Sequence, residues 1–168
     1  MGVLQSLKRW FLDPQVSRKK QFLRSLELFA DLKGRDLGEL AHSLHVRTYR
    51  PGEVVFVQGD IGRALFILES GAVELTRAGA DGRPVHLYTL KPGEFFGEMA
   101  LLESLPRTAT ATAAAPSRLH LLYRTQLDAL LRSEPRIGVI IMSQLARLLS
   151  SRLRRATGER ETPPAPHA

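Results

Sequence analysis

From about residue 3 to residue 45, apolar residues recur every three or four positions, which is the spacing of one helix face. Pro14 divides this region, because a proline ring is not tolerated inside a helix. A second break falls at Lys33-Gly34, after which the helical pattern continues. The apolar positions are Val3, Leu7, Trp10 and Phe11, then Phe22, Leu26 and Phe29, and finally Leu32, Leu37, Leu40, Ala41 and Leu44.

The middle of the chain, from Val46 to Tyr123, has a different pattern of short apolar or alternating runs. Turn residues at regular spacing separate the runs, which is typical of an antiparallel sandwich or barrel of jelly-roll type. One small helical turn, over Gly97–Ser104, interrupts the predicted strands. The turns lie at Gly59-Asp60, Ser70-Gly71, Asp81-Gly82 and Pro92-Gly93.

The last third is helical again. Thr125 and Asp128 have the spacing of a capping box that opens a helix over Gln126–Leu131. Pro135 indicates a second helix start, because proline is tolerated in the first turn. An apolar stripe then continues to about Arg155 through Ile137, Ile141, Leu145, Leu148 and Leu149. The tail, residues 157–168, carries three prolines, and we expect it to be disordered.

Composition narrows the class of protein. The chain has 168 residues, 43% of them hydrophobic, which suits one domain with a sizeable core. It has no cysteine, so disulfides, zinc–thiolate sites and cysteine nucleophiles are excluded. No apolar run approaches the roughly 20 residues that a spanning helix needs, and no secretory signal is visible. We therefore expect a cytoplasmic protein.

The net charge of +7 is concentrated at the two ends of the chain. Basic residues outnumber acidic ones in 1–50 and in 117–168, whereas acidic residues outnumber basic ones in 51–116. A nucleic-acid binder can have this distribution, but runs of charge more often cover the solvated faces of helices. We favour the second interpretation.

The segment from 95 to 110 carries the most chemical information. Gly97 allows close backbone approach and precedes a short helical turn, whose first N–H groups favour an anion. Arg107 supplies a planar five-donor fork suited to a phosphate, and Glu98 supplies an acceptor for a sugar hydroxyl. A loop that combines a phosphate-binding group, an acceptor for a sugar hydroxyl and free space indicates a nucleotide-binding site. The small residues that leave space are Ala100 and Ala109.

These residues resemble the phosphate-binding cassette of the cyclic-nucleotide-binding domain family, Phe-Gly-Glu-x-Ala-Leu followed after a short spacer by Pro-Arg-x-Ala. The resemblance extends from about Phe22 to Arg155. It implies a mainly β fold, an eight-stranded antiparallel β-roll flanked by N-terminal helices and two C-terminal helices. It also implies a cyclic-nucleotide site made of Gly97, Glu98, Met99, Ala100, Pro106, Arg107, Thr108 and Ala109.

The resemblance assigns a role to each of the main site residues. Glu98 would accept the ribose 2′-hydroxyl, and Arg107 would pair with the cyclic phosphate. The backbone N–H groups of Ala100 and Ala109 would complete the phosphate cage. Thr108 stands where relatives of either base preference carry threonine, so it does not decide between cAMP and cGMP. We expect cAMP in preference to cGMP as the ligand, with no metal.

The resemblance also sets an expected layout. Residues 1–21 form an N-terminal amphipathic segment, and residues 22–156 form the binding domain. Within that domain we expect N-terminal helices over 22–45, the β-roll over 46–123, and lid or dimer helices over 125–156.

The expected function is that of a sensor and not of an enzyme. Ligand binding would shift the C-terminal helices, Gln126–Arg155, and so act on an unidentified partner protein. The apolar stripe of these helices could instead form a parallel homodimer. DNA binding is not expected, because the usual helix-turn-helix module does not follow.

Three alternatives are weighed against this hypothesis. The fold could serve as a ligand-silent scaffold or interaction module. A basic regulator could contact nucleic acid through Arg147, Arg152, Arg154 and Arg155. Residues Met1–Ser6 fit a myristoylation pattern, and the Val3–Phe11 stripe could lie on a membrane or a partner, although we favour packing on the barrel. The histidines His42, His45, His86, His120 and His167 do not form a metal-binding motif.

Overall fold

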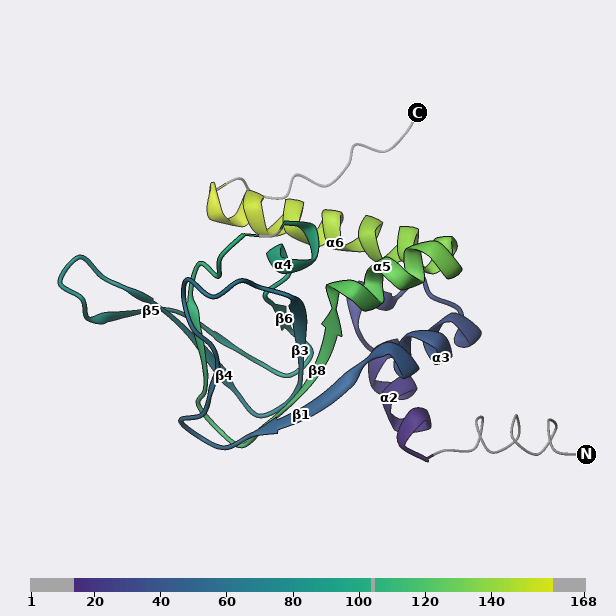
Figure 1. Cartoon of the computed structure of the whole chain (residues 1–168), viewed down its shortest axis with the longest axis horizontal. Coiled ribbons are helices and arrows are strands. Elements are labelled where there is room, and N and C mark those ends of the chain that lie inside the picture. The colour runs from purple at the N-terminus through teal and green to yellow at the C-terminus, as the bar shows by residue number, and fades with distance from the viewer. Residues whose placement is uncertain (1–13, 104, 159–168) are drawn as a thin grey trace, which may run out of the picture.

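The computed structural model describes residues 14–103 and 105–158. Within these residues, eight strands form two antiparallel four-stranded sheets that wrap into a roll (Figure 1), with strand orders β1-β8-β3-β6 and β2-β7-β4-β5. The expected eight-stranded β-roll is therefore confirmed. The strands are β1 (His45–Tyr49), β2 (Val54–Phe56), β3 (Ala64–Ser70), β4 (Val73–Ala78), β5 (Pro84–Leu90), β6 (Phe95–Phe96), β7 (Thr110–Ala113) and β8 (Ser117–Tyr123).

Helices flank the roll at both ends of its sequence, and most of them lie together on one side of it, while the last helix runs from there across the roll (Figure 1). They are α2 (Pro14–Arg24), the 3₁₀ helix η1 (Glu27–Phe29), α3 (Gly34–Ser43), α5 (Arg124–Ser133) and α6 (Pro135–Ala156), while the one-turn α4 (Met99–Leu102) lies between β6 and β7. The two expected C-terminal helices are thus present. Of the helices in the described part of the chain, none is long and apolar enough to cross a membrane.

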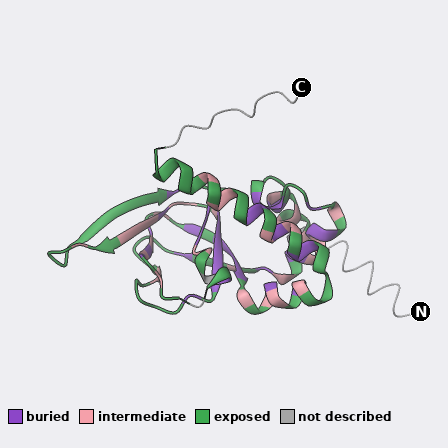
Figure 2. Cartoon of the chain, turned by 90° about the horizontal axis from the view of Figure 1, so that it is seen from above, coloured by how far each residue is buried: buried purple, intermediate pink, exposed green. Residues whose placement is uncertain are grey.

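Strands β3 and β8 are buried on both faces, which explains their nearly continuous apolar sequences. In β3, Phe66 and Leu68 face the core inside the roll, whereas Leu65 and Ile67 belong to a second core under the helices. Figure 2 shows this buried centre in purple, while the β4–β5 hairpin and the end of α6 are largely exposed. The β3–β8 pair therefore joins the two hydrophobic cores.

Of the two predicted starts of the C-terminal helices, the structure confirms one and contradicts the other. Helix α6 begins at Pro135, as expected. The prediction of a capping box that begins at Thr125 is wrong, because α5 already begins at Arg124. The Arg124 N–H donates to the carbonyl of Arg63 at 2.9 Å, so the end of the sheet fixes where the helix begins. The first-turn acceptor is Gln126, whose Oε1 accepts the Tyr123 N–H at 3.1 Å.

Helix α2 begins at Pro14, where a proline is tolerated, and continues to Arg24. The predicted boundary between residues 21 and 22 therefore falls within this helix. The expectations for Val3–Phe11, for the myristoylation pattern of Met1–Ser6 and for most of the tail lie outside the described residues.

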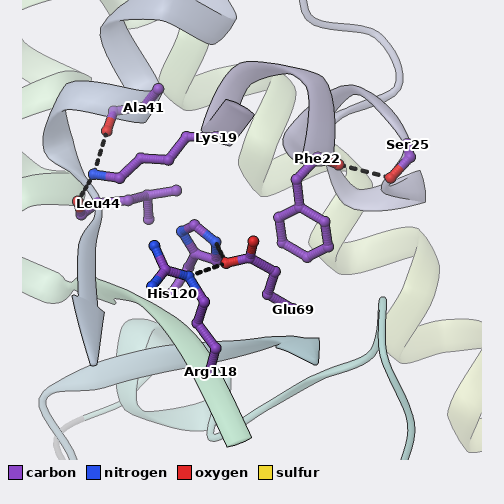
Figure 3. A network of polar contacts seen from close by, with 8 residues as sticks. All are labelled: Lys19, Phe22, Ser25, Ala41, Leu44, Glu69, Arg118 and His120. Carbon is purple, nitrogen blue, oxygen red and sulfur yellow. Dashed lines mark hydrogen bonds and ion pairs between the residues drawn. The ribbon is translucent and has the colours of Figure 1, made fainter. Parts of the chain in front are cut away.

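A polar network fastens α2 to the outer face of the β1-β8-β3-β6 sheet (Figure 3). The His120 side chain is 1% exposed, and its Nε2 lies 2.7 Å from Oε2 of Glu69. The ring of Phe22 stacks on His120 at 5.0 Å, and Arg118 also donates to Glu69 at 2.7 Å. Lys19 donates to the Leu44 carbonyl at 3.0 Å. His120 is therefore a buried structural histidine.

Candidate functional site

The segment that connects β6 to β7 borders a cavity of about 500 Å³. The sheet side of the cavity is apolar and aromatic, with Phe56, Leu75, Tyr88 and Leu90, and the far end of α6 contributes Arg152 and Arg155. The predicted site residues that line it are Gly97, Glu98, Met99, Pro106, Arg107, Thr108 and Ala109. Ala100, the remaining predicted residue, belongs to the one-turn helix α4.

The backbone conformation at position 97 requires a glycine. The φ angle of Gly97, 72°, lies in the left-handed region, which residues other than glycine rarely adopt. A Cβ atom built there would lie 2.5 Å from Nη1 of Arg107 and 3.3 Å from the carbonyl oxygen of Ala64. Glycine thus provides both the turn into α4 and the space for the Arg107 guanidinium.

The Arg107 guanidinium is fixed from several sides. Nη1 donates to the Gly97 carbonyl at 3.0 Å, and Nη2 donates to the Ala64 carbonyl at 2.9 Å. Its central carbon lies 4.1 Å from the ring centroid of Phe56 and 5.4 Å from that of Phe66, which are cation–π distances. Such contacts hold the cation in place before any ligand arrives.

Burial lowers the pKa of Arg107, and the charges of Glu98 and Asp60 partly oppose that effect. Arginine nevertheless remains protonated in proteins. The cavity therefore contains a desolvated permanent cation, which favours an anionic ligand.

The turn at Gly59-Asp60 supports the arginine through the backbone. The Arg107 N–H donates to the Asp60 carbonyl at 2.7 Å, and the Arg107 carbonyl accepts the Gly59 N–H at 2.9 Å. Ile61 forms an isolated bridge with Pro106. The Gly59-Asp60 turn, which the sequence indicated only as a separator between two strands, thus fixes the position of the cassette.

Glu98 directly precedes α4, and its side chain is 15% exposed. Its Oε1 lies 3.4 Å from Nη1 of Arg152 on α6. Nη2 of Arg152 also donates to the Phe95 carbonyl at 2.9 Å, and the guanidinium carbon lies 4.1 Å above the Phe95 ring. The carboxylate that faces the cavity is therefore already paired with the last turns of α6.

Arg152 was not among the predicted site residues, since the sequence placed it in a basic surface patch. A signal for its role is nevertheless present. Arg152 follows Leu145 by two helical turns, on the face that also carries Ile141 and Leu148. A charged residue that continues an apolar stripe indicates a polar partner under the helix.

The ionisable side chains that line the cavity belong to Glu94, Glu98, Arg107, Arg152, Arg155 and Tyr88, whose hydroxyl group donates a hydrogen bond to Glu94 at 2.7 Å. In residues 14–103 and 105–158, no group of three or more histidine, aspartate or glutamate side chains has the geometry of a metal site.

Residues 46–134, more than half of the chain, match the sequence profile of the cyclic nucleotide-binding domain. The chain therefore belongs to the cyclic nucleotide-binding domain family.

Two relatives show where such a domain occurs. Over 110 residues the chain is 42% identical to the Cyclic AMP receptor protein of Thermus thermophilus, covering 66% of this chain and 49% of that protein. Over 110 residues it is 36% identical to a cAMP-dependent protein kinase regulatory subunit of Yarrowia lipolytica, covering 66% of this chain and 28% of that protein. The aligned part is thus half or less of either relative.

The fold agrees with a solved structure. The crystal structure of the Catabolite Activator Protein of Thermus thermophilus superposes with a TM-score of 0.71 and 38% sequence identity. The superposition covers 79% of this chain and 61% of that chain.

Proposed function

We propose that this chain binds a cyclic nucleotide, cAMP in preference to cGMP, and acts as a regulatory module and not as an enzyme. One observation carries the proposal. Arg107, fixed under two aromatic rings, and Glu98, a largely buried carboxylate, line the same cavity of about 500 Å³. A ligand that satisfies both needs an anionic group and a hydroxyl group.

The cyclic phosphate would bind at Arg107. Two of the five guanidinium N–H groups are used on the carbonyls of Gly97 and Ala64. The remaining N–H groups can donate to phosphate oxygens, and such charge-assisted hydrogen bonds are stronger than neutral ones. The backbone N–H groups of Ala100 and Ala109 would complete this subsite.

The ribose and the base would occupy the rest of the cavity. Glu98 would accept the 2′-hydroxyl, while Leu75, Tyr88 and Leu90 provide an apolar wall. The Thr108 side chain lines the cavity, but a hydroxyl is compatible with either purine. The preference for cAMP is supported by the names of the two relatives, a cyclic AMP receptor protein and a cAMP-dependent kinase regulatory subunit.

The output would pass through the C-terminal helices to a partner protein. Strand β8 ends at Tyr123 and α5 begins at Arg124, so the roll leads into the helices without a linker. Glu134 alone separates α5 from α6. A change in the cavity can therefore reach α6 both through the chain and through Arg152.

A second copy of this chain is one possible partner of α6. The apolar stripe that the sequence suggested for a homodimer is not available, because Ile137, Ile141 and Leu145 are buried in the core of the chain itself. Five positions of α6 are exposed or half-buried and repeat at alternating steps of three and four, the spacing of a two-stranded coiled coil. They are Val139, Met142, Ala146, Leu149 and Leu153. Sedimentation equilibrium of the wild type and of Leu153→Asp tests this proposal. A wild-type dimer that the variant converts to a monomer supports it, and a monomeric wild type contradicts it.

Thermal unfolding with cAMP, with cGMP and with 5′-AMP tests the ligand. A ligand at about 1,000 times its Kd stabilises the folded state by roughly 4 kcal/mol. For a chain of this size, that raises the midpoint by about 10 °C. A rise with cAMP, a smaller rise with cGMP and none with 5′-AMP is expected. No rise with either cyclic nucleotide at millimolar concentration would favour the ligand-silent scaffold instead.

A further inference from the structure

Tyr88 is the polar member of the apolar wall of the cavity. Among the described strand residues that line the cavity, it alone has a side chain that forms hydrogen bonds, since the others are leucine or phenylalanine. Tyr88 pairs with Leu75 across β4 and β5, and its hydroxyl group donates to Oε1 of Glu94 at 2.7 Å. A tyrosine hydroxyl has one proton. Because that proton is used on Glu94, the Tyr88 oxygen can only accept a hydrogen bond from a ligand.

The turn between β5 and β6 holds the Glu94 carboxylate in place. Its Oε2 accepts the Lys91 N–H at 2.7 Å, and the Glu94 N–H donates to the Lys91 carbonyl at 3.1 Å. The same arrangement closes the turn before β2, where Oε2 of Glu53 accepts the Arg50 N–H at 2.8 Å. One oxygen of Glu94 thus closes the turn, and the other is available to Tyr88.

The hydrogen bond to Glu94 also keeps the Tyr88 hydroxyl protonated. It is the largest of the causes that raise the pKa of Tyr88 above its ordinary value of 10.0. The charges of Arg152 and Arg155, which also line the cavity, act in the opposite direction. At neutral pH the pair therefore consists of a neutral hydroxyl and a carboxylate, and both present acceptors to the cavity.

We propose that Tyr88 selects the base by accepting a hydrogen bond from the 6-amino group of adenine, and that Glu94 positions Tyr88 for this role. The inference rests on the proposed function, because it needs the phosphate at Arg107 and the ribose at Glu98. The 6-amino group is carried by the ring of adenine that is remote from the ribose, so it would reach the wall beyond those two residues. Guanine has an acceptor, the 6-oxo group, in the same place. That group would face the Tyr88 oxygen with no proton between them.

Two analogues of cAMP isolate the 6-position. Purine riboside 3′,5′-cyclic phosphate has a hydrogen atom there, and inosine 3′,5′-cyclic phosphate (cIMP) has the oxo group of guanine without its 2-amino group. Isothermal titration calorimetry gives the Kd of each analogue and of cAMP. The wild type should bind cAMP about 3- to 10-fold more tightly than either analogue, in keeping with one hydrogen bond.

Tyr88→Phe tests the acceptor itself, because it keeps the ring and removes only the hydroxyl group. The advantage of cAMP over the purine riboside analogue should disappear in this variant. Tyr123→Phe is the matched control, since it removes the hydroxyl of a tyrosine that does not line the cavity, and it should keep the wild-type preference. A preference in Tyr88→Phe equal to that of the wild type overturns the inference.

Glu94→Gln tests the positioning role. The amide oxygen must accept the Lys91 N–H, so the amide NH₂ group is turned to Tyr88 and donates to its oxygen. The Tyr88 proton is then available to the 6-oxo group, and cIMP should gain about 3- to 10-fold in affinity relative to cAMP. Glu53→Gln makes the same change in the equivalent turn, outside the cavity lining, and should leave the ratio unchanged. A ratio that does not change in Glu94→Gln, or that changes equally in Glu53→Gln, overturns the role of Glu94.

Failure of this inference and failure of the proposed function give different results. A wild type that binds none of the three nucleotides at millimolar concentration contradicts the proposed function, and base selection by Tyr88 with it. A wild type that binds cAMP and the purine riboside analogue equally well leaves the proposed function intact and overturns base selection by Tyr88 alone.

Discussion

Nη1 of Arg107 donates a hydrogen bond to the carbonyl oxygen of Gly97 at 3.0 Å, and the same nitrogen would lie 2.5 Å from a Cβ atom on that glycine. The conformation of Gly97 and the position of the Arg107 guanidinium thus depend on each other. The left-handed turn directs the carbonyl at the guanidinium, and the missing side chain leaves the guanidinium its place. A cassette with only one of them would not have this geometry.

Gly97→Ala should therefore destabilise the fold and abolish nucleotide binding. The left-handed φ and the contact with Arg107 together cost about 1–3 kcal/mol, in the range of strained backbone positions. Thermal unfolding and calorimetric titration with cAMP measure the two effects. Gly38→Ala is the control, because Gly38 lies in α3 and a methyl group added there would have no atom within 4 Å apart from its chain neighbours and the backbone of its own helix. That variant should gain up to about 1 kcal/mol, and equal losses in both variants would contradict the prediction.

Removing Arg107 should weaken cyclic-nucleotide binding strongly. Arg107→Ala leaves the phosphate without its charge partner, a loss of about 2–5 kcal/mol, or roughly 30- to several-thousand-fold in Kd. Arg107→Lys keeps the charge but not the planar fork, so its affinity should lie between the two. Arg83→Ala, at an 87% exposed side chain, should bind like the wild type. Binding by Arg107→Ala as tight as that of the wild type would refute the assignment of the phosphate subsite.

The role of Glu98 can be isolated with a ligand that lacks one hydroxyl. The wild type should bind cAMP more tightly than 2′-deoxy-cAMP by about 10- to 100-fold, because a hydrogen bond to a charged group contributes about 1.5–3 kcal/mol. In Glu98→Ala the two ligands should bind equally, whereas Glu103→Ala should keep the preference. Competition against a fluorescent cyclic nucleotide gives both affinities. A preference that survives in Glu98→Ala would place the 2′-hydroxyl elsewhere.

The buried His120 in the polar network below α2 predicts a loss of stability in mild acid. Burial lowers the pKa of His120 below its ordinary value of 6.5, and the nearby Lys19 and Arg118 charges act in the same direction, while Glu69 opposes them. The unfolded chain then binds a proton more readily than the folded chain. Stability from this group is fully present above about pH 6.5 and is lost as the pH falls toward the lower pKa of the folded state.

The measurement is the change in unfolding midpoint between about pH 7.5 and about pH 5.5, the range in which histidine titrates. The drop should be smaller in His120→Gln and in His120→Phe than in the wild type, whatever their absolute stability. His86→Gln, in the exposed β5 strand, should behave like the wild type. An equal drop in all four proteins would show that other groups dominate the acid response.

Most strands and the cassette could be predicted because their signals are local, whereas β1, β6 and β7 gave no separate apolar run and the number of eight strands came from the family resemblance. The turns after β2, β3 and β5 contain glycines in the left-handed region, and the sequence shows them as Gly59, Gly71 and Gly93. The apolar runs of β3 and β8 indicated strands as well. Their burial between two cores was not evident, because a continuous apolar run does not say what covers each face.

The pairing of Arg152 with Glu98 could not be predicted, because it depends on the direction in which α6 crosses the roll. The start of α5 was misplaced for a related reason. The Arg124 N–H bonds to the Arg63 carbonyl, so the neighbouring strand and not the local capping pattern decides where the helix begins. Both errors concern contacts between residues that are distant in the chain.

The single residue between α5 and α6 makes α6 a lever. A helix of 22 residues is about 33 Å long, so a rotation of about 10° at Glu134 would move Ala156 by about 6 Å. Ile137, near the pivot, would move by less than about one ångström, but Leu145, halfway along the helix, would move by about 3 Å. Leu145 is 1% exposed, so rotation of the whole helix would disturb the core. Large movement of the exposed end with an undisturbed core would therefore require α6 to bend beyond Leu145.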